Sequence, residues 1–105
     1  MSNIEYQSGD RFFEWDSEKA KRNKIKHGIS FKVAARVFED DDRIERPDEE
    51  HSQTEERWQV IGKVENILFV VYTERGDRTR IISAREATPV EKEWYYNGDG
   101  NLYFA

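Results

Sequence analysis

Hydrophobic positions in the first forty residues form one short run and then recur at a helical spacing. Residues 12–15 hold three aromatic side chains and one glutamate, which predicts a short strand. A lysine-rich helix is predicted over residues 19–27, with N-cap candidates at positions 16 and 17 and Gly28 in the left-handed position after its end. A second helix follows the cap residue Ser30, because the next apolar positions form one stripe: Phe31, Ala34, Ala35 and Phe38.

The second half of the chain instead has the two-residue period of strands. Residues 57–64 alternate as in a half-buried strand. Residues 67–73 are apolar on both faces, which predicts a central strand, and residues 78–85 form the returning strand. Turns at 65–66 and 76–77 join these three strands as consecutive antiparallel hairpins.

Two further elements complete the pattern. An edge strand over residues 43–46 is stopped by Pro47 and leads into an exposed loop over residues 48–55. A third helix begins in the segment 88–91, where Thr, Pro and Glu supply the N-cap, the first-turn proline and the capping-box carboxylate. This helix is predicted to end near Tyr96.

The order of elements predicts an α+β fold, with a small antiparallel sheet packed against two N-terminal helices and one C-terminal helix. A chain of 105 residues is long enough for one core. We expect a flexible lead-in over residues 1–11, a folded domain over 12–97 and a C-terminal tail over 98–105.

Charge is segregated along the chain, whose net charge is −5. Residues 39–56 hold ten acidic and two basic residues, whereas residues 17–36 hold seven basic residues and one acidic residue. One surface can therefore attract phosphate while another repels it.

The chain has no cysteine and two histidines, which excludes a disulfide scaffold and a thiolate zinc site. Carboxylates with a histidine remain possible metal ligands, but we expect no metal and no cofactor. The sequence contains no apolar run of membrane-spanning length, and the first ten residues lack the features of a signal peptide. We expect a cytoplasmic protein that does not bind a membrane.

The densest set of candidate functional residues is a run of four arginines between positions 73 and 85. A guanidinium matches phosphate oxygens with two parallel donors, and a rigid strand holds it in place for a phosphodiester that gains charge in its transition state. Alternation places two of the arginines on one face with Ile82 and the last on the other face. The alternative is that they pair with acidic neighbours on a solvated hairpin: Glu74, Asp77 and Glu86.

Candidate proton carriers are His27, His51 and Glu74. An imidazole titrates near neutral pH and suits acid–base catalysis, although His27 beside a helix end is also a common capping arrangement. Glu74 can act as a base on a ribose 2′-hydroxyl, or it can merely orient Arg80.

Several blocks of the sequence, in order, resemble the BrnT toxins of type II toxin–antitoxin systems. The blocks span residues 13–16, 26–31, 34–38, 48–62 and 73–91. The similarity extends from about Phe12 to Tyr96. In one respect the chain departs from the family, whose last helix is often basic, because here Glu91 and Glu93 outnumber Lys92.

This resemblance implies a RelE-like fold, cleavage of RNA that arrests translation and growth, and neutralisation by a BrnA-type antitoxin. The antitoxin carries a DNA-binding domain, so operator DNA is bound only through it, and the complex represses its own operon. The site residues that the resemblance implies are His27, Glu74, Arg75, Arg80 and Arg85, with His51 as a secondary candidate.

The mechanism we hypothesise is metal-independent attack of the 2′-hydroxyl on the phosphodiester. Arg75, Arg80 and Arg85 would hold the phosphate, and His27 or Glu74 would carry the proton. The alternative is a non-catalytic module whose hairpin and acidic loop only dock a protein partner. We also expect the antitoxin to bind residues 17–36 and the arginine hairpin through acidic residues interleaved with apolar ones.

Overall fold

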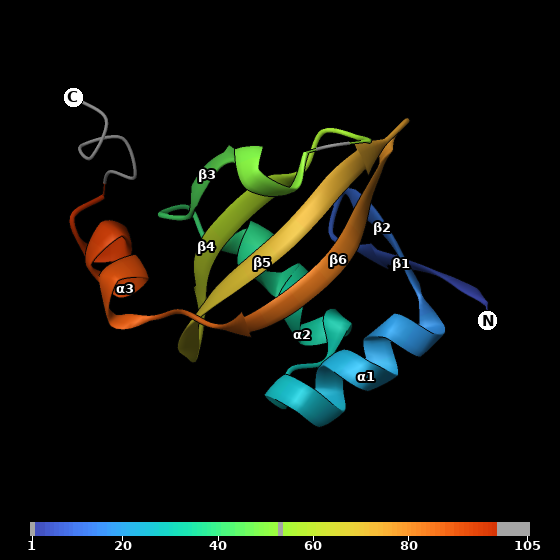
Figure 1. Cartoon of the computed structure of the whole chain (residues 1–105), viewed down its shortest axis with the longest axis horizontal. Helices are drawn as coiled ribbons and strands as arrows, with labels where there is room; N and C mark the ends of the chain where they lie inside the picture. The colour runs from blue at the N-terminus through green and yellow to red at the C-terminus, as the bar shows by residue number, and fades with distance from the viewer. Residues whose placement is uncertain (1, 53, 99–105) are drawn as a thin grey trace.

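A six-stranded sheet with the order β1-β2-β6-β5-β4-β3 forms the centre of the molecule (Figure 1). The computed structural model describes residues 2–52 and 54–98. β5 and β6 are the two central strands, as predicted from their apolar character. The strands are β1 (Asn3–Ser8), β2 (Arg11–Asp16), β3 (Ile44–Pro47), β4 (Trp58–Val64), β5 (Asn66–Arg75) and β6 (Arg78–Glu86).

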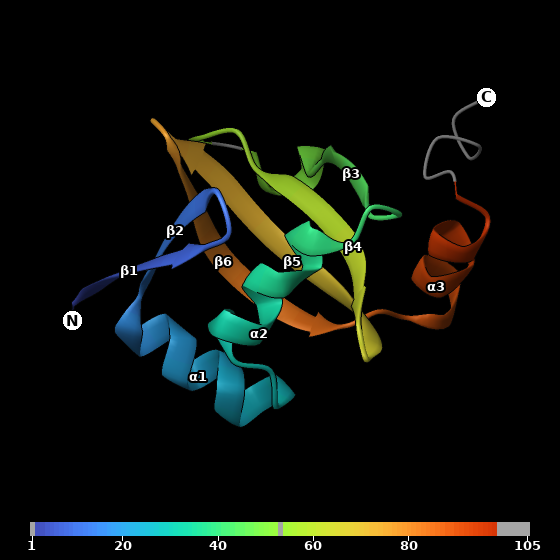
Figure 2. The ribbon, with the colours of Figure 1, turned by 180° about the vertical axis from the view of Figure 1, so that it is seen from behind.

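Helices lie on both sides of this sheet but cover it unequally. The helices α1 (Ser17–His27) and α2 (Phe31–Ala35) cover one face, which we call the helix face (Figure 2). Its strands contribute Phe13, Val70 and Ile81 to the larger core cluster. We call the opposite face the open face. α3 (Pro89–Tyr96) packs on one end of it, around Phe69.

The predicted helix ends are confirmed by their capping contacts. Asp16 accepts a hydrogen bond from the backbone N–H of Lys19 at 2.9 Å. Gly28 has a φ of 74°, the left-handed conformation that ends α1. Thr88 and Glu91 form the complete capping box at the start of α3.

The prediction of a wholly antiparallel sheet was wrong, because β2 pairs with β6 in parallel and the sheet is mixed. The chain leaves β2 directly into α1, which packs against β6. β2 is thereby brought beside β6 in the same direction.

The first residues are also not irregular, since β1 pairs with β2 along its whole length. Ile4 and Tyr6 alternate with polar residues and pack onto the core. This two-residue period is the signal that the prediction of a flexible lead-in overlooked.

Two local departures concern the middle of the chain. The second helix is shorter than predicted and continues as a 3₁₀ turn, η1 (Arg36–Glu39), because Val37 packs against Gly62. The segment predicted as an exposed loop contains a 3₁₀ turn, η2 (Glu49–His51), and Asp48 before it is 2% exposed. The backbone N–H of Asp48 donates to the carbonyl of Arg57 at 2.8 Å, which fixes this segment to the start of β4.

Within the described residues, no helix is long and apolar enough to cross a membrane. The predicted tail lies, from residue 99 onward, outside the part of the chain that the structure describes.

Candidate functional site

A bulge in β6 brings the candidate arginines onto one face of the sheet. Val71 pairs with Ser83 and Tyr72 pairs with Ile81, so Ile82 is an extra residue without a partner on β5. An extra residue reverses the alternation of side chains beyond it.

The prediction that Arg85 points away from Arg78 and Arg80 was therefore wrong. Across the antiparallel pair, Arg85 lies opposite Phe69 and Arg80 lies opposite Thr73. Both β5 residues belong to the open face. Arg75 pairs with Arg78 on the same face, so four arginines share it.

Arg80 is held by two side chains from the N-terminal hairpin. Its Nη1 donates to Oε2 of Glu14 at 2.7 Å and to Oδ1 of Asn3 at 2.7 Å. Burial alone would raise the pKa of Glu14, but the hydrogen bonds from Arg80 and Arg78 and the charges of Arg80 and Arg75 outweigh it, so this pKa lies below its ordinary value. Glu14 is therefore ionised at neutral pH and keeps the guanidinium of Arg80 in one orientation.

Arg85 is held by the first turn of α3. It donates from Nη1 and Nη2 to the two carboxylate oxygens of Glu91 at 2.8 and 3.0 Å, and its guanidinium lies 4.1 Å from the ring centroid of Phe69. Burial acts to raise the pKa of Glu91, but the bonds from Arg85 and Thr88 lower it below its ordinary value. This carboxylate thus joins the capping box to the arginine.

The other two arginines of the face contact carboxylates that are more exposed. Nη2 of Arg75 lies 3.2 Å from Oε2 of Glu55, and Nη1 of Arg78 lies 2.6 Å from Oε2 of Glu5. The alternative predicted from the sequence had the arginines paired with Glu74, Asp77 and Glu86, whereas the ion pairs of these four arginines are made with Glu55, Glu5, Glu14 and Glu91.

A cavity of about 330 Å³ opens on the same face, between the sheet, η2 and α3. Arg46 on β3 lies at its edge with its guanidinium 4.0 Å from the ring centroid of Trp94. The cavity has apolar and aromatic walls beside two arginines, which are groups that can hold a base and a phosphate, and three carboxylates also line it. Its lining is Arg46, Asp48, Glu50, Gln59, Phe69, Val71, Ser83, Arg85, Glu91 and Trp94.

A larger cavity of about 870 Å³ lies elsewhere, beside the three consecutive carboxylates Asp40, Asp41 and Asp42. Tyr95 also lines it, and its hydroxyl donates to Oδ2 of Asp40 at 2.6 Å. The smaller cavity is the better candidate for an RNA site, because Arg85 of the arginine face lines it.

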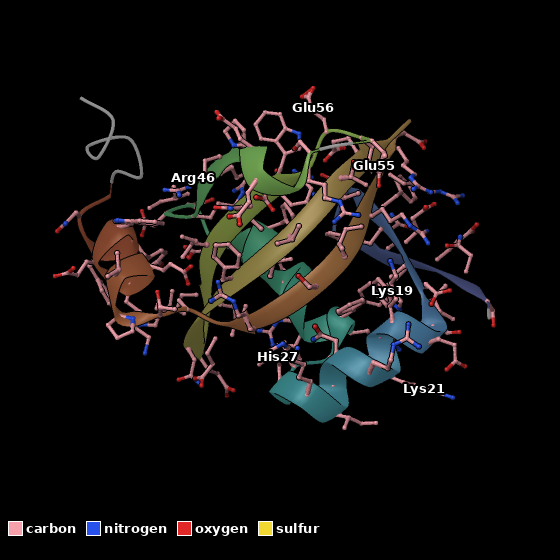
Figure 3. All side chains as sticks on the ribbon, viewed as in Figure 1. Lys19, Lys21, His27, Arg46, Glu55 and Glu56 are labelled. Atoms are coloured by element: carbon pink, nitrogen blue, oxygen red, sulfur yellow. The ribbon has the colours of Figure 1, made fainter. Side chains whose placement is uncertain are left out.

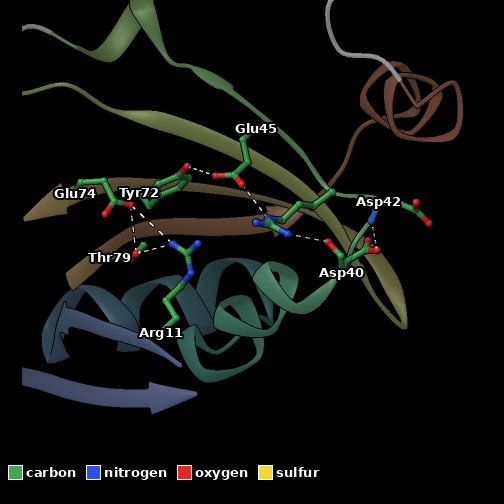
Figure 4. Close-up of polar contacts among 8 residues, drawn as sticks. Arg11, Asp40, Asp42, Glu45, Tyr72, Glu74 and Thr79 are labelled. Carbon is green, nitrogen blue, oxygen red and sulfur yellow. Dashed lines mark hydrogen bonds and ion pairs between the residues drawn. The ribbon is translucent and has the colours of Figure 1, made fainter. Parts of the chain in front are cut away.

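Glu74 is separated from these arginines, because it lies opposite Thr79 on the helix face. It accepts a hydrogen bond from Oγ1 of Thr79 at 3.3 Å, and Nη1 of Arg11 is 4.0 Å from it (Figure 4). The expectation that Glu74 orients Arg80 was therefore wrong, since Glu14 has that position.

The two histidines lie in different parts of the molecule. His27 is exposed at the end of α1, far from Arg46 in the view of Figure 3. Among the described residues, no hydrogen bond or ion pair joins His27 to the arginines. His51 ends η2, whose neighbours Asp48 and Glu50 line the smaller cavity, while its side chain lies outside what the structure describes.

Sequence reasoning missed the carboxylates that hold the arginines. Glu14 is a lone acidic residue inside an aromatic strand, which was the available signal for a buried partner. Glu91 was recognised only as a capping residue. In the described ranges 2–52 and 54–98, no three His, Asp or Glu side chains are grouped to hold a metal ion.

A family model matches most of the chain, and a solved structure shares its fold. A family model described as "Ribonuclease toxin, BrnT, of type II toxin-antitoxin system" matches residues 15–91. The 1.1 Å crystal structure of the Brucella abortus ribonuclease toxin BrnT is similar with a TM-score of 0.56 and 24% sequence identity, over 70% of this chain and 92% of that chain. No curated protein sequence matches significantly.

Proposed function

The chain belongs to the BrnT family of ribonuclease toxins of type II toxin–antitoxin systems, and from this premise we propose that it cleaves RNA on the open face of its sheet. The observation that carries this proposal is the gathering of Arg75, Arg80 and Arg85 on one face. The cavity that Arg85 lines supplies the adjoining space for a nucleotide.

The proposed reaction is metal-independent transfer of a phosphodiester to its own 2′-hydroxyl. The hydroxyl loses its proton, its oxygen forms a bond to phosphorus, and the bond from phosphorus to the 5′-oxygen breaks as that oxygen gains a proton. The products are a 2′,3′-cyclic phosphate and a 5′-hydroxyl. Guanidinium groups that are already oriented stabilise the charge that develops on the phosphate oxygens.

Glu14 and Glu91 support this role as positioning residues. Both oxygens of each carboxylate contact arginine guanidinium groups. These contacts hold the guanidinium groups in place on a rigid strand. Cationic donors fixed in this way need little rearrangement during the reaction.

The mechanism hypothesised from the sequence used His27 or Glu74 as the proton carrier, with His51 as a secondary candidate, and both His27 and Glu74 lie away from the arginine face. We propose His51 instead, because η2 borders the cavity that Arg85 lines. Replacement of each histidine by Ala, with cleavage rates measured across pH, distinguishes His51 from His27.

We further propose that the partner is a BrnA-type antitoxin with a DNA-binding domain, which neutralises the toxin and represses the operon as a complex. The RelE-like character that the resemblance implies is part of the same proposal. Family membership is the observation that supports both proposals.

The test is incubation of the purified protein with RNA in the presence of a chelator. We expect fragments with 5′-hydroxyl ends, and no cleavage of DNA or of RNA blocked at the 2′ position. Ends with a 5′-phosphate, or activity that the chelator abolishes, would contradict the mechanism.

One observation favours the non-catalytic alternative, since all four arginines of the face already contact carboxylates. In that case they serve to dock a protein rather than to bind RNA. Intact RNA after incubation with folded protein would support this alternative.

A further inference from the structure

A third cavity, of about 590 Å³, lies between α1, the first two strands and the start of α2, and has a largely apolar lining. β1 and β2 form one wall through Ile4 and Trp15, and the helices form the other wall. We call it the α1 groove. Its lining includes Ile4, Trp15, Ala20, Ile25 and Phe31, with Lys21, Lys24 and Lys32 around them.

Ile25 is the most exposed large hydrophobic residue of the described chain, at 86%. α1 is fixed to the sheet mainly by Asn23, its one buried residue, whose side-chain amide donates to the carbonyl of Ala84 at 2.9 Å and accepts from its N–H. The fold therefore does not need Ile25. An apolar side chain at the edge of an apolar groove is a feature of a binding surface.

The charges around the groove select the kind of partner. Lys21, Lys24 and Lys32 line it, and α1 carries a single acidic residue, Glu18. A nucleic acid would use the lysines but leave the apolar wall uncovered. An amphipathic segment with acidic residues beside apolar ones satisfies both.

We propose that the α1 groove binds an acidic amphipathic segment of a partner protein. That the partner is the antitoxin rests on the proposed function, whereas the chemistry of the segment rests on the groove alone. In this wall, Ile4 lies outside the range 15–91 that the family model matches, whereas Trp15 is the first residue within it.

The groove and the arginines lie on different sides of the sheet. α1 packs on the helix face, while Arg80 and Arg85 belong to the open face. The expectation that one segment covers both surfaces is therefore replaced by two separate contacts. The α1 groove anchors the partner, and the arginine face stays available to RNA until another part of the partner covers it.

The experiment uses a fluorescent helical peptide of leucine and glutamate, and measures its binding to the full chain by anisotropy. Two matched peptides replace glutamate by lysine or leucine by serine. We expect Ile25→Asn and Lys24→Glu each to weaken binding of the acidic amphipathic peptide by about tenfold or more.

Two control variants make the same kinds of substitution outside the α1 groove. Lys26→Glu alters the same charge on the same helix outside the groove, and Val90→Asn removes an exposed apolar side chain on α3. Both should leave peptide binding within about twofold of the unmodified protein.

Several outcomes would overturn the proposal. These are no binding of the acidic amphipathic peptide, equal binding of the lysine or serine peptide, or equal loss in the control variants. Reversible self-association that Ile25→Asn abolishes would assign the groove to a second copy, and loss of RNA binding in that variant would assign it to RNA. RNA cleavage by Ile25→Asn is measured in parallel, so failure of the ribonuclease proposal is recognised separately.

Discussion

At the scale of single residues, Arg80 is the strongest test of the arginine face. Replacement of Arg80 by Ala should lower the RNA cleavage rate by about a hundredfold or more, because one preorganised donor to the phosphate is lost. Arg80→Lys should recover only part of the activity, since an ammonium lacks the two-pronged geometry. Cleavage of a labelled RNA by folded protein is the measurement.

This substitution also leaves Glu14 buried without its main partner. The double variant Arg80→Ala/Glu14→Gln removes that charge, so a loss of activity in it is not caused by a buried carboxylate without a partner. Full activity in the folded double variant would show that Arg80 does not act on RNA.

Glu91 tests whether an arginine must be held in place as well as present. Glu91→Gln removes the charged partner of Arg85 but retains an oxygen that can accept from the N–H of Thr88. We expect a loss of about 1 kcal/mol in the free energy of unfolding and a slower cleavage rate with unchanged RNA affinity. Urea denaturation and single-turnover kinetics provide the two values, and a rate equal to that of the unmodified protein would remove Glu91 from the site.

At the scale of elements, Gly62 controls how closely η1 approaches β4. A Cβ at this position would lie 3.0 Å from both Cβ and the carbonyl oxygen of Val37. Gly62→Ala should therefore destabilise the fold by about 1–3 kcal/mol, because backbone must move. The neighbouring exposed substitution Lys63→Ala is the control in thermal denaturation, and equal midpoints for the two variants would refute this packing.

Caps and turns, which involve residues close in sequence, predicted most helices and strands, but not which strands pair with one another. The caps at Asp16 and Thr88 and the hairpin before Arg78 depend on residues close in sequence, so the sequence is sufficient to place them. The bulge at Ile82 depends on the pairing of β6 with β5, and no residue type at this position predicts it.

The separation of partners along the sequence also explains which residues of the site were predicted. The arginines are adjacent in sequence and were found, while Glu14 lies 66 residues from Arg80 and was not. Contacts of that separation follow from the order of strands, which the sequence pattern alone left open.

At the scale of the whole molecule, acid should unfold the protein through three carboxylates. Glu14, Glu91 and Asp40 each have a pKa below the ordinary value, in Asp40 because bonds from Tyr95 and Lys63 outweigh the effect of burial. Their contribution to stability is complete above the unfolded pKa of about 4 and is lost as pH falls through the lower folded values.

The urea midpoint should therefore change little between about pH 7 and pH 5 and fall steeply below about pH 4. The variant Glu14→Gln/Glu91→Gln should start lower at neutral pH and lose less in acid. An equally steep acid transition in that variant would assign it to other groups.

The parallel pairing of β2 with β6 has a consequence for how the protein is made. β6 is the last strand in the sequence, yet it stands between β2 and β5. A growing chain that ends before Arg78 holds β1 with β2 and β3 to β5 as two pieces with no strand to join them. Arg80 and Arg85 are themselves among the residues added late, so the face that is proposed to cut RNA is assembled only when synthesis is nearly complete. Chains that end before Arg78 therefore lack the face proposed to cut RNA, so the strand order ties the activity of that face to a late stage of synthesis.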